Sequence, residues 1–226
     1  MKPERVLDRY EKIAPRYDRV VNLSARLTLY PLERYRKEAV EALHLRPGDT
    51  ALEIGCGTGL NFRYIQERIG PKGRLIALDY TPAMLQQAEM KVESLGWKNV
   101  EFVQGDAAEV AQLVPGPVDA ALSTACLCIV PGWERAIAGA ATLLRPGGRL
   151  AVLDWLTMKP KGPLGLVSPL VRWWTKHYGF ADPDVDFKEA RPWKATMEQY
   201  LTSVDYREMY SGTMFLCHGE KGQGRG

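Results

Sequence analysis

Three glycines on alternate positions follow an apolar segment in "TALEIGCGTGLNF", residues 50–62. A glycine turn between a strand and a helix lets the backbone approach a ligand closely, and the helix N-terminus favours polar or anionic groups there. The turn continues into Leu60 and Asn61 rather than Lys and Ser/Thr, which excludes a nucleoside-triphosphate loop. Leu60 also stands where a dinucleotide fingerprint has its third glycine. The glycine spacing alone leaves a purely structural tight turn open.

Three acidic residues near strand ends give this turn a chemical context. Glu53 lies in the strand before the glycines, where a buried carboxylate is costly unless it has a partner such as an ammonium group. Asp79 ends the next predicted strand, where a carboxylate can accept hydrogen bonds from both ribose hydroxyls. Asp106 ends the third strand and is placed to meet an adenine amino group. Because open α/β sheets bind ligands beyond the carboxyl ends of their strands, we expect a shared nucleoside site rather than three helix caps.

The elements that must position these residues alternate between apolar strands and helices. Strands are predicted at residues 50–55, 73–79, 100–106, 118–130 and 147–155. Helices are predicted at 3–43 (charged and interrupted), 61–70, 81–96, 133–144 and about 194–203, and a hairpin at 205–220. Continuous apolar strands separated by helices predict an α/β fold with a mostly parallel sheet covered by helices on both faces.

Four segments in order, "LEIGCGTG", "LDYTPAML", "VQGDA" and "LLRPGGRLAVLD", resemble the motifs of class I S-adenosylmethionine-dependent methyltransferases over about residues 45–155. The resemblance implies a Rossmann-like seven-stranded sheet ending in an antiparallel hairpin, with S-adenosylmethionine as cofactor. It assigns the glycine turn and Glu53 to the methionine end, Asp79 to the ribose, and the pairs Tyr80/Met84 and Asp106/Ala107 to the adenine. The cofactor-binding residues that it implies are Glu53, Gly55, Cys56, Gly57, Gly59, Asp79, Tyr80, Met84, Asp106, Ala107 and Ser123.

The flanking segments carry two further resemblances that bear on the acceptor. "YEKIAPRYDRVVNLS" and "YSGTMFLCHGEK" are similar to the ends of ubiquinone/menaquinone C-methyltransferases, whereas "WWTKHYGFADPDVDFKEARPW" is similar to bacterial phosphatidylethanolamine N-methyltransferases. The first hypothesis is therefore methylation of a lipid amino head group. A quinone precursor and another small acceptor remain as alternatives.

These resemblances divide residues 1–218 into the parts of a single methyltransferase domain. The parts are an N-terminal helical cap (1–44), a cofactor-binding core (45–155), a substrate- or membrane-facing insertion (157–196) and a closing helix and hairpin (197–218), with a flexible tail at 219–226.

The insertion combines an apolar run with basic residues in "PLGLVSPLVRWWTKHYGF". An apolar segment flanked by basic residues is typical of a protein that binds the surface of an anionic bilayer. A helix packed on the sheet would show the same pattern. The basic surplus of the chain lies at residues 1–48, with 11 Lys/Arg against 7 Asp/Glu, and at 157–196, with 7 against 4. The predicted substrate or membrane contacts are Arg172, Trp173, Trp174, Lys176 and Arg191. A net charge of +3 is too small to predict a nucleic-acid partner.

Methyl transfer needs in-line attack on a sulfonium methyl group, and catalysis can come largely from positioning. An amine acceptor must also lose a proton. The candidates for this chemistry are Tyr10, Tyr17, His177 and Tyr178. Aromatic faces attract methylated ammonium and sulfonium groups, a role that suits the N-terminal tyrosines, and amphipathic packing is the plain alternative. Tyr17, in "PRYDRV", is the leading candidate.

The four cysteines favour neither a disulfide framework nor a zinc site. Cys126 and Cys128 fall on one predicted strand, where both side chains would join the core. The charged start "MKPERVLDRYEK" does not resemble a signal peptide, and no apolar run is long enough to cross a membrane. We expect a cytoplasmic location, with peripheral contact to the inner membrane face as a further hypothesis. An NAD-dependent oxidoreductase and a non-catalytic cofactor-binding protein are the competing classes.

Overall fold

The computed structural model describes residues 3–157, 161 and 191–223. Its strands form one seven-stranded sheet in the order β3-β2-β1-β4-β5-β7-β6. All neighbours pair in parallel except β7, which is antiparallel to both β5 and β6. The strands are β1 (Thr50–Ile54), β2 (Arg74–Asp79), β3 (Val100–Gln104), β4 (Val118–Thr124), β5 (Leu144–Trp155), β6 (Thr202–Met209) and β7 (Met214–Glu220). The sheet and its closing antiparallel hairpin confirm the predicted fold class.

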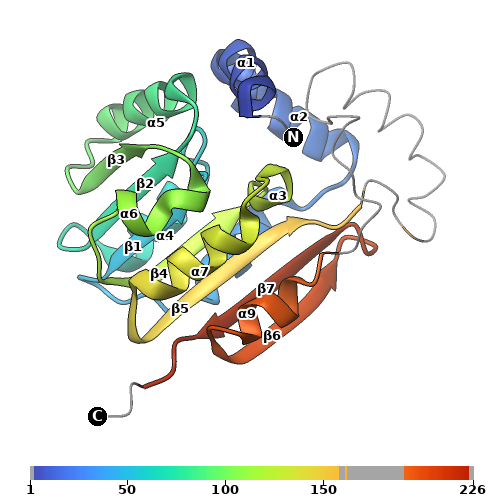
Figure 1. The fold of residues 1–226 in the computed structure, drawn as a ribbon. Helices are drawn as coiled ribbons and strands as arrows, with labels where there is room; N and C mark the ends of the chain where they lie inside the picture. The colour runs from blue at the N-terminus through green and yellow to red at the C-terminus, as the bar shows by residue number, and fades with distance from the viewer. Residues whose placement is uncertain (1–2, 158–160, 162–190, 224–226) are drawn as a thin grey trace.

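Helices cover both faces of this sheet (Figure 1). One face packs against α3 (Leu32–Glu41), α4 (Phe62–Ile69) and α5 (Pro82–Leu95). The other packs against α6 (Val110–Leu113), α7 (Trp133–Leu143) and α9 (Trp193–Glu198). Two more helices, α1 (Pro3–Ile13) and α2 (Tyr17–Leu27), stand beside α5 above the strands in this view. Short 3-10 turns lie at η1 (Ala14–Arg16), η2 (Ala107–Glu109) and η3 (Leu127–Ile129).

The chain order reverses between β1 and β4, which lie side by side. Strand β1 leads to β2 on one side, and β4 leads to β5 on the other. Such a switch point leaves a crevice beyond the carboxyl ends of the strands, where α/β folds bind ligands. Alternation along β1 sends Leu52 and Ile54 into the core under α7 and Ala51 into the core under α3 and α4. Glu53 therefore faces α3 and α4.

Two predicted elements are shorter than the sequence indicated. The apolar run at residues 118–130 leaves the sheet after Thr124, because Ala125 adopts a left-handed conformation with φ of 51°. Cys126 and Cys128 consequently lie around η3 and not on a strand. The predicted helix at 194–203 ends at Glu198, and Thr202 already belongs to β6. Pairing with β7 overrides the helical pattern at its end.

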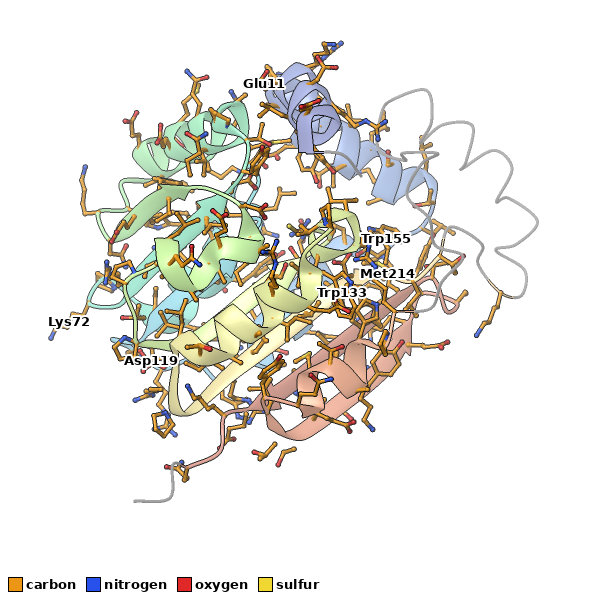
Figure 2. The ribbon with its side chains drawn as sticks, viewed as in Figure 1. Glu11, Lys72, Asp119, Trp133, Trp155 and Met214 are labelled. Carbon is orange, nitrogen blue, oxygen red and sulfur yellow. The ribbon has the colours of Figure 1, made fainter. Side chains whose placement is uncertain are left out.

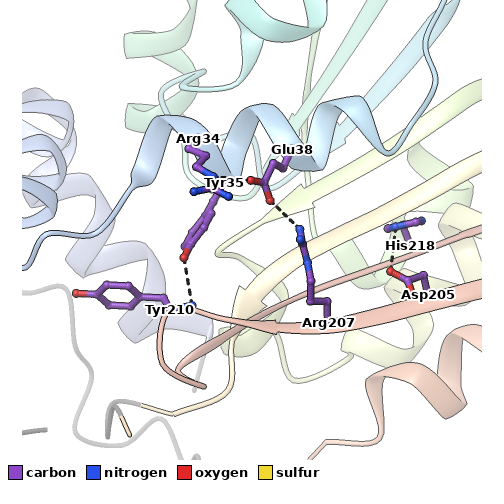
Figure 3. Close-up of polar contacts among 7 residues, drawn as sticks. All are labelled: Arg34, Tyr35, Glu38, Asp205, Arg207, Tyr210 and His218. Atoms are coloured by element: carbon purple, nitrogen blue, oxygen red, sulfur yellow. Dashed lines mark hydrogen bonds and ion pairs between the residues drawn. The ribbon is translucent and has the colours of Figure 1, made fainter. Parts of the chain in front are cut away.

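Helix α3 is attached to the C-terminal hairpin by polar contacts (Figure 3). The backbone amide of Tyr210 donates to the hydroxyl of Tyr35 at 3.2 Å, and Arg207 forms an ion pair with Glu38 at 2.7 Å. Arg34 donates to the same carboxylate at 2.8 Å. Although each exposed ion pair contributes little, the set fixes how α3 lies against the sheet. The side of α3 that carries Arg36 is thereby held towards the sheet interior.

An aromatic cluster attaches the turn between α2 and α3 to the carboxyl end of β5. The ring of Tyr30 lies 5.5 Å from Tyr35, 5.7 Å from Trp155 and 5.1 Å from Tyr210, measured between centroids. Trp155 is the register partner of Met214 on β7, and Figure 2 shows the two side chains close together. Contacts of this kind stabilise by about 0.5–1.5 kcal/mol each beyond burial.

Most of the predicted insertion lies outside the described residues. This applies to the predicted contacts Arg172, Trp173, Trp174 and Lys176 and to the catalytic candidates His177 and Tyr178. Those assignments stay predictions, as does the division of the chain into parts.

Candidate active site

A cavity lies at the switch point, roofed by the N-terminal helices. Together with adjoining open solvent, it contains about 900 Å³ of space not filled by protein atoms. Ten of the predicted site residues line it together: Tyr10, Tyr17, Gly55, Cys56, Gly57, Asp79, Tyr80, Met84, Asp106 and Ala107. The described lining also includes residues that the sequence did not single out, among them Arg36, Thr58, Thr124 and Cys126.

The glycine turn has a backbone conformation that disfavours side chains. Gly55 has φ of 69° and Gly57 has φ of 54°, both in the left-handed region that favours glycine. A Cβ atom on Gly55 would lie 2.1 Å from the sulfur of Cys126, so the turn and the loop after β4 are in direct contact. Only a residue without a side chain fits there.

Asp79 holds the glycine turn from the end of β2. Its Oδ2 accepts a hydrogen bond from the amide of Gly57 at 2.7 Å, and its Oδ1 accepts from the amide of Thr81 at 2.8 Å. Burial raises the pKa of this carboxyl, while these backbone donors oppose the shift. Asp79 therefore shapes the turn and also presents its carboxylate to the cavity.

Asp106 likewise has two roles. Its Oδ1 accepts from the amide of Ala108 at 2.9 Å, so it caps η2, a role that the sequence analysis had set aside. It also lines the cavity beside Ala107. The predicted contact with an adenine edge is compatible with the cap, because a carboxylate can accept several hydrogen bonds.

Arg36 is the main site residue that the sequence analysis missed. Its Nη1 donates to Asn61 Oδ1 and to Thr124 Oγ1, both at 2.9 Å. Asn61 Nδ2 in turn donates to Glu53 Oε1 at 2.6 Å and to Thr124 Oγ1 at 2.8 Å. We refer to Arg36, Glu53, Asn61 and Thr124 as the switch-point network. A signal for it exists in the sequence: Arg36 falls between Leu32 and Ala39/Val40 on the apolar stripe of α3.

Two atoms of the switch-point network have no hydrogen-bond partner among the described residues. They are Arg36 Nε and Glu53 Oε2, and both are buried. An unpaired buried polar atom costs about 1–3 kcal/mol, more when it is charged. Burial raises the pKa of Glu53 to about 7, whereas the hydrogen bond from Asn61 and the charge of Arg36 lower it. The network can therefore bind one further anionic group at Arg36 Nε and one further cationic group at Glu53 Oε2.

The tyrosines of the cap lie next to each other in the lining of the cavity. Tyr10 on α1 and Tyr17 at the start of α2 have ring centroids 6.2 Å apart, inclined at 55°. Burial raises the pKa of Tyr17 to about 12 and that of Tyr10 well above its usual value. Both hydroxyls are therefore protonated at neutral pH. The geometry fits aromatic contact and hydrogen bonding and disfavours either tyrosine as a base.

Asp18 fixes the start of α2 over the glycine turn. Its Oδ1 accepts from the hydroxyl of Thr58 at 2.5 Å, and its Oδ2 pairs with Lys91 on α5 at 2.9 Å. Because Tyr17 directly precedes Asp18 in the chain, these two contacts of Asp18 also determine where the Tyr17 ring lies. The cap and the turn are thus positioned by one carboxylate.

Four predicted residues that the structure describes are absent from the cavity lining: Glu53, Gly59, Ser123 and Arg191. Ser123 donates to the backbone oxygen of Ile54 at 3.0 Å and so joins β4 to β1. Gly59 has φ of 75°, and a Cβ atom there would lie 2.6 Å from the ring of Phe62. Arg191 donates to Leu127 O at 2.8 Å and lies over two tryptophan rings. Any contact of these residues with a ligand stays a prediction.

The cysteines beside the cavity are poor nucleophiles. Burial raises the pKa of the Cys56 and Cys126 thiols well above the usual value, so both stay protonated at neutral pH. Within the described part of the chain, no group of three or more His, Cys, Asp and Glu residues could hold a metal ion.

Comparison with known proteins shows what the chain resembles. Residues 51–148 match the model of a methyltransferase domain. A demethylmenaquinone methyltransferase of Bacillus cereus is 31% identical over 153 residues, which cover 68% of this chain and 63% of the relative. These matches place a methyltransferase domain at residues 51–148 and show that about two thirds of the chain is similar to a methyltransferase.

Other relatives agree with this assignment at the level of the fold. The crystal structure of a SAM-dependent methyltransferase from Aquifex aeolicus superposes with a TM-score of 0.59 at 21% identity, covering 90% of this chain and 97% of that one. An uncharacterized 37.1 kDa protein in transposon TN4556 of Streptomyces fradiae is 34% identical over 148 residues, 65% of this chain and 41% of that protein. The chain thus spans less than two thirds of these two curated relatives. None of the helices in the described residues is long and apolar enough to span a bilayer.

Substituting Glu53 should change how stability depends on pH. Because burial raises the pKa of Glu53 in the folded protein, its charge destabilises the fold increasingly as pH rises from about 4.5 to about 7. Glu53→Gln removes that charge. We expect the unfolding free energy of the cofactor-free variant, relative to wild type, to rise across this window by about 3 kcal/mol. Urea unfolding at pH 5 and pH 8, with the exposed Glu93→Gln as control, measures the difference. A constant difference at both pH values would contradict a buried, hard-to-ionise Glu53.

Proposed function

We propose that this protein transfers a methyl group from S-adenosylmethionine to the amino head group of a membrane lipid of the phosphatidylethanolamine type. The methyltransferase domain supplies the first half of this proposal. The second half rests on the paired tyrosine rings at the cavity mouth and on the resemblance of residues 173–193 to lipid N-methyltransferases. Each part is testable separately.

The residues at the switch point fit this cofactor on two observations. Gly55 and Gly57 line the cavity with bare backbone, since a Cβ atom on Gly55 would collide with Cys126, and the two unpaired buried atoms of the switch-point network offer one cationic and one anionic contact. An α-amino acid group carries the complementary carboxylate and ammonium charges. We assign Arg36 to the carboxylate and Glu53, with Asn61, to the side of the ammonium group.

The nucleoside part is assigned to the other lining residues. Asp79 would accept hydrogen bonds from the ribose hydroxyls, Tyr80 and Met84 would flank the adenine, and Asp106 with Ala107 would face its edge. When bound, the cofactor supplies an electrophilic sulfonium methyl group. The protein's own contribution is to orient that group and to keep it facing the cap.

Tyr17 and Tyr10 are assigned to the acceptor. Their faces suit a methylated ammonium or the sulfonium, an attraction of about 0.5–2 kcal/mol depending on desolvation. Their protonated hydroxyls can donate to an acceptor oxygen or accept from an amine, and thereby direct the nitrogen lone pair at the methyl group. Among the described lining residues, Asp79 and Asp106 outnumber Arg36, so the cavity charge also suits a cationic product. The amine proton would pass to solvent at the open mouth.

C-methylation of a quinone precursor is the second candidate. It is favoured by the Bacillus relative, which is named a demethylmenaquinone methyltransferase. A quinol offers a ring carbon in place of a nitrogen lone pair, and the aromatic pair Tyr10/Tyr17 could stack on such a ring. The two candidates share a membrane-borne acceptor and differ in the atom methylated.

Labelled methyl donor should distinguish the acceptors. The purified protein is incubated with S-adenosylmethionine labelled on the methyl group and with mixed micelles containing either phosphatidylethanolamine or demethylmenaquinone. We expect label in the phospholipid head group, because its amine becomes the nucleophile. Label in the quinone alone would select the second candidate. Label in neither lipid, with cofactor binding intact, would contradict both.

Removing the Tyr17 hydroxyl should lower the rate but not cofactor binding. For Tyr17→Phe we expect a turnover lower by about ten- to a thousandfold, equivalent to about 1.4–4 kcal/mol, because the acceptor loses its orienting hydrogen bond while the ring remains. Steady-state rates, melting temperatures and S-adenosylhomocysteine affinity of the Phe and Ala variants separate this from packing. A tyrosine that only packs would give an active Phe variant and an unstable Ala variant.

A further inference from the structure

Helix α2 and the turn after it expose leucines on the outer side of the cap. The exposed fractions are 46% for Leu23, 61% for Leu27 and 79% for Leu29. Leu29 is held there with φ of 55°, a conformation that is uncommon for a residue with a side chain. Exposing large apolar side chains in a group is unfavourable in water and marks an interaction surface when a polar rim surrounds it.

Helical spacing places these leucines beside two arginines. At 100° per residue, Arg19, Leu23, Arg26 and Leu27 fall within one sector of about 100° on α2. Asp18, which accepts a hydrogen bond from Thr58 of the glycine turn, lies outside this sector. We call Arg19, Leu23, Arg26, Leu27 and Leu29 the outer cap surface. An open groove runs along it towards the start of α3.

The outer cap surface carries positive charge that can bind an anionic partner. Both acidic residues closest to it are already paired: Asp18 with Lys91, and Glu33 with Arg63. Arg19 and Arg26 are exposed and form no ion pair within the described part of the chain. An apolar stripe flanked by exposed arginines matches the interface of an anionic bilayer, with leucines at the acyl boundary and guanidinium groups among the head groups.

A second copy of this chain fits the same surface less well. A symmetric pairing through the outer cap surface would bring the arginines of the two copies near each other, while Asp18 and Glu33 beside that surface already pair with Lys91 and Arg63. An anionic lipid surface satisfies the leucines and the arginines together. We therefore infer that the partner of the outer cap surface is an anionic bilayer and not a second copy of the chain.

We propose that the outer cap surface docks the protein on anionic membranes. It is separate from the predicted contacts at residues 172–176, and it rests on the proposed function only for its purpose, the delivery of a lipid acceptor. Because α2 begins with Tyr17 at the cavity mouth and continues into the outer cap surface, docking brings the mouth of the active site to the lipid head groups. Membrane contact and access to the site are thus coupled through one helix.

The apolar part is tested by co-sedimentation with vesicles of phosphatidylglycerol and phosphatidylcholine. Leu27→Ser combined with Leu29→Ser should weaken binding by at least about tenfold, because both side chains leave the acyl boundary. The matched control is Met90→Ser combined with Leu95→Ser on α5, where the exposed fractions are 57% and 55%. The control should bind like wild type. Equal loss in both double variants, or loss in neither, overturns the proposal.

The electrostatic part is tested with Arg19→Gln combined with Arg26→Gln. Binding to the anionic vesicles should fall by about tenfold or more at low salt and lose much of its salt dependence, while the exposed pair Lys72→Gln and Lys98→Gln has no such effect. If wild-type protein bound vesicles of pure phosphatidylcholine as strongly as the anionic vesicles, the proposed preference for anionic lipid would be contradicted.

Two further readouts separate this proposal from the proposed function and from self-association. Methyl transfer to a short-chain acceptor dispersed in solution should be unchanged in both outer-cap variants, since none of these residues lines the cavity. Transfer that persists without any vesicle binding by wild type overturns the docking surface alone. Sedimentation velocity detects a copy–copy interface: a dimer that the leucine variant dissociates, with vesicle binding unaltered, also overturns it.

Discussion

A buried hydrogen-bond network at the switch point of the sheet connects four elements beside the cofactor cavity. Arg36 comes from α3, Glu53 from β1, Asn61 from the turn before α4, and Thr124 from the end of β4. Burying a charged pair is costly unless hydrogen bonds satisfy it, and removal of one partner commonly costs 3–5 kcal/mol. The four elements are therefore held in one arrangement, and the geometry of the glycine turn depends on it.

Two sets of contacts extend from this network to the rest of the fold. Through α3, Tyr35 and Glu38 connect it to the C-terminal hairpin, so the antiparallel end of the sheet supports the position of Arg36 (Figure 3). On the other side, the glycine turn binds Asp79 and the cap residue Asp18. A ligand that binds the two unpaired atoms of the network would therefore also stabilise the positions of the hairpin and of the cap that carries Tyr17.

The sequence predicts the residues whose role follows from local pattern and misses those whose role follows from packing. The glycine spacing and the acids at strand ends identify Gly57, Asp79 and Asp106, because strand–turn–helix geometry is encoded within a few residues. Arg36 was passed over because a helical, charged segment looks like a solvated face, and only its place on an apolar stripe distinguishes it. The apolar run at 118–130 was too long because hydrophobicity does not reveal the left-handed turn at Ala125. The raised pKa values of the cap tyrosines depend on burial that no local pattern shows.

The most direct test of this account compares two ligands in one substitution. S-adenosylhomocysteine carries the amino acid group and 5′-methylthioadenosine lacks it, so the ratio of their affinities measures recognition by the switch-point network. Calorimetry on Arg36→Lys should show S-adenosylhomocysteine binding weakened about tenfold, since a lysine cannot keep the guanidinium hydrogen bonds, with 5′-methylthioadenosine affinity unchanged. Arg34→Lys, exposed on the same helix, should leave both affinities as in wild type. Equal weakening of both ligands in Arg36→Lys, or of neither, would contradict the assignment of the network to the amino acid group.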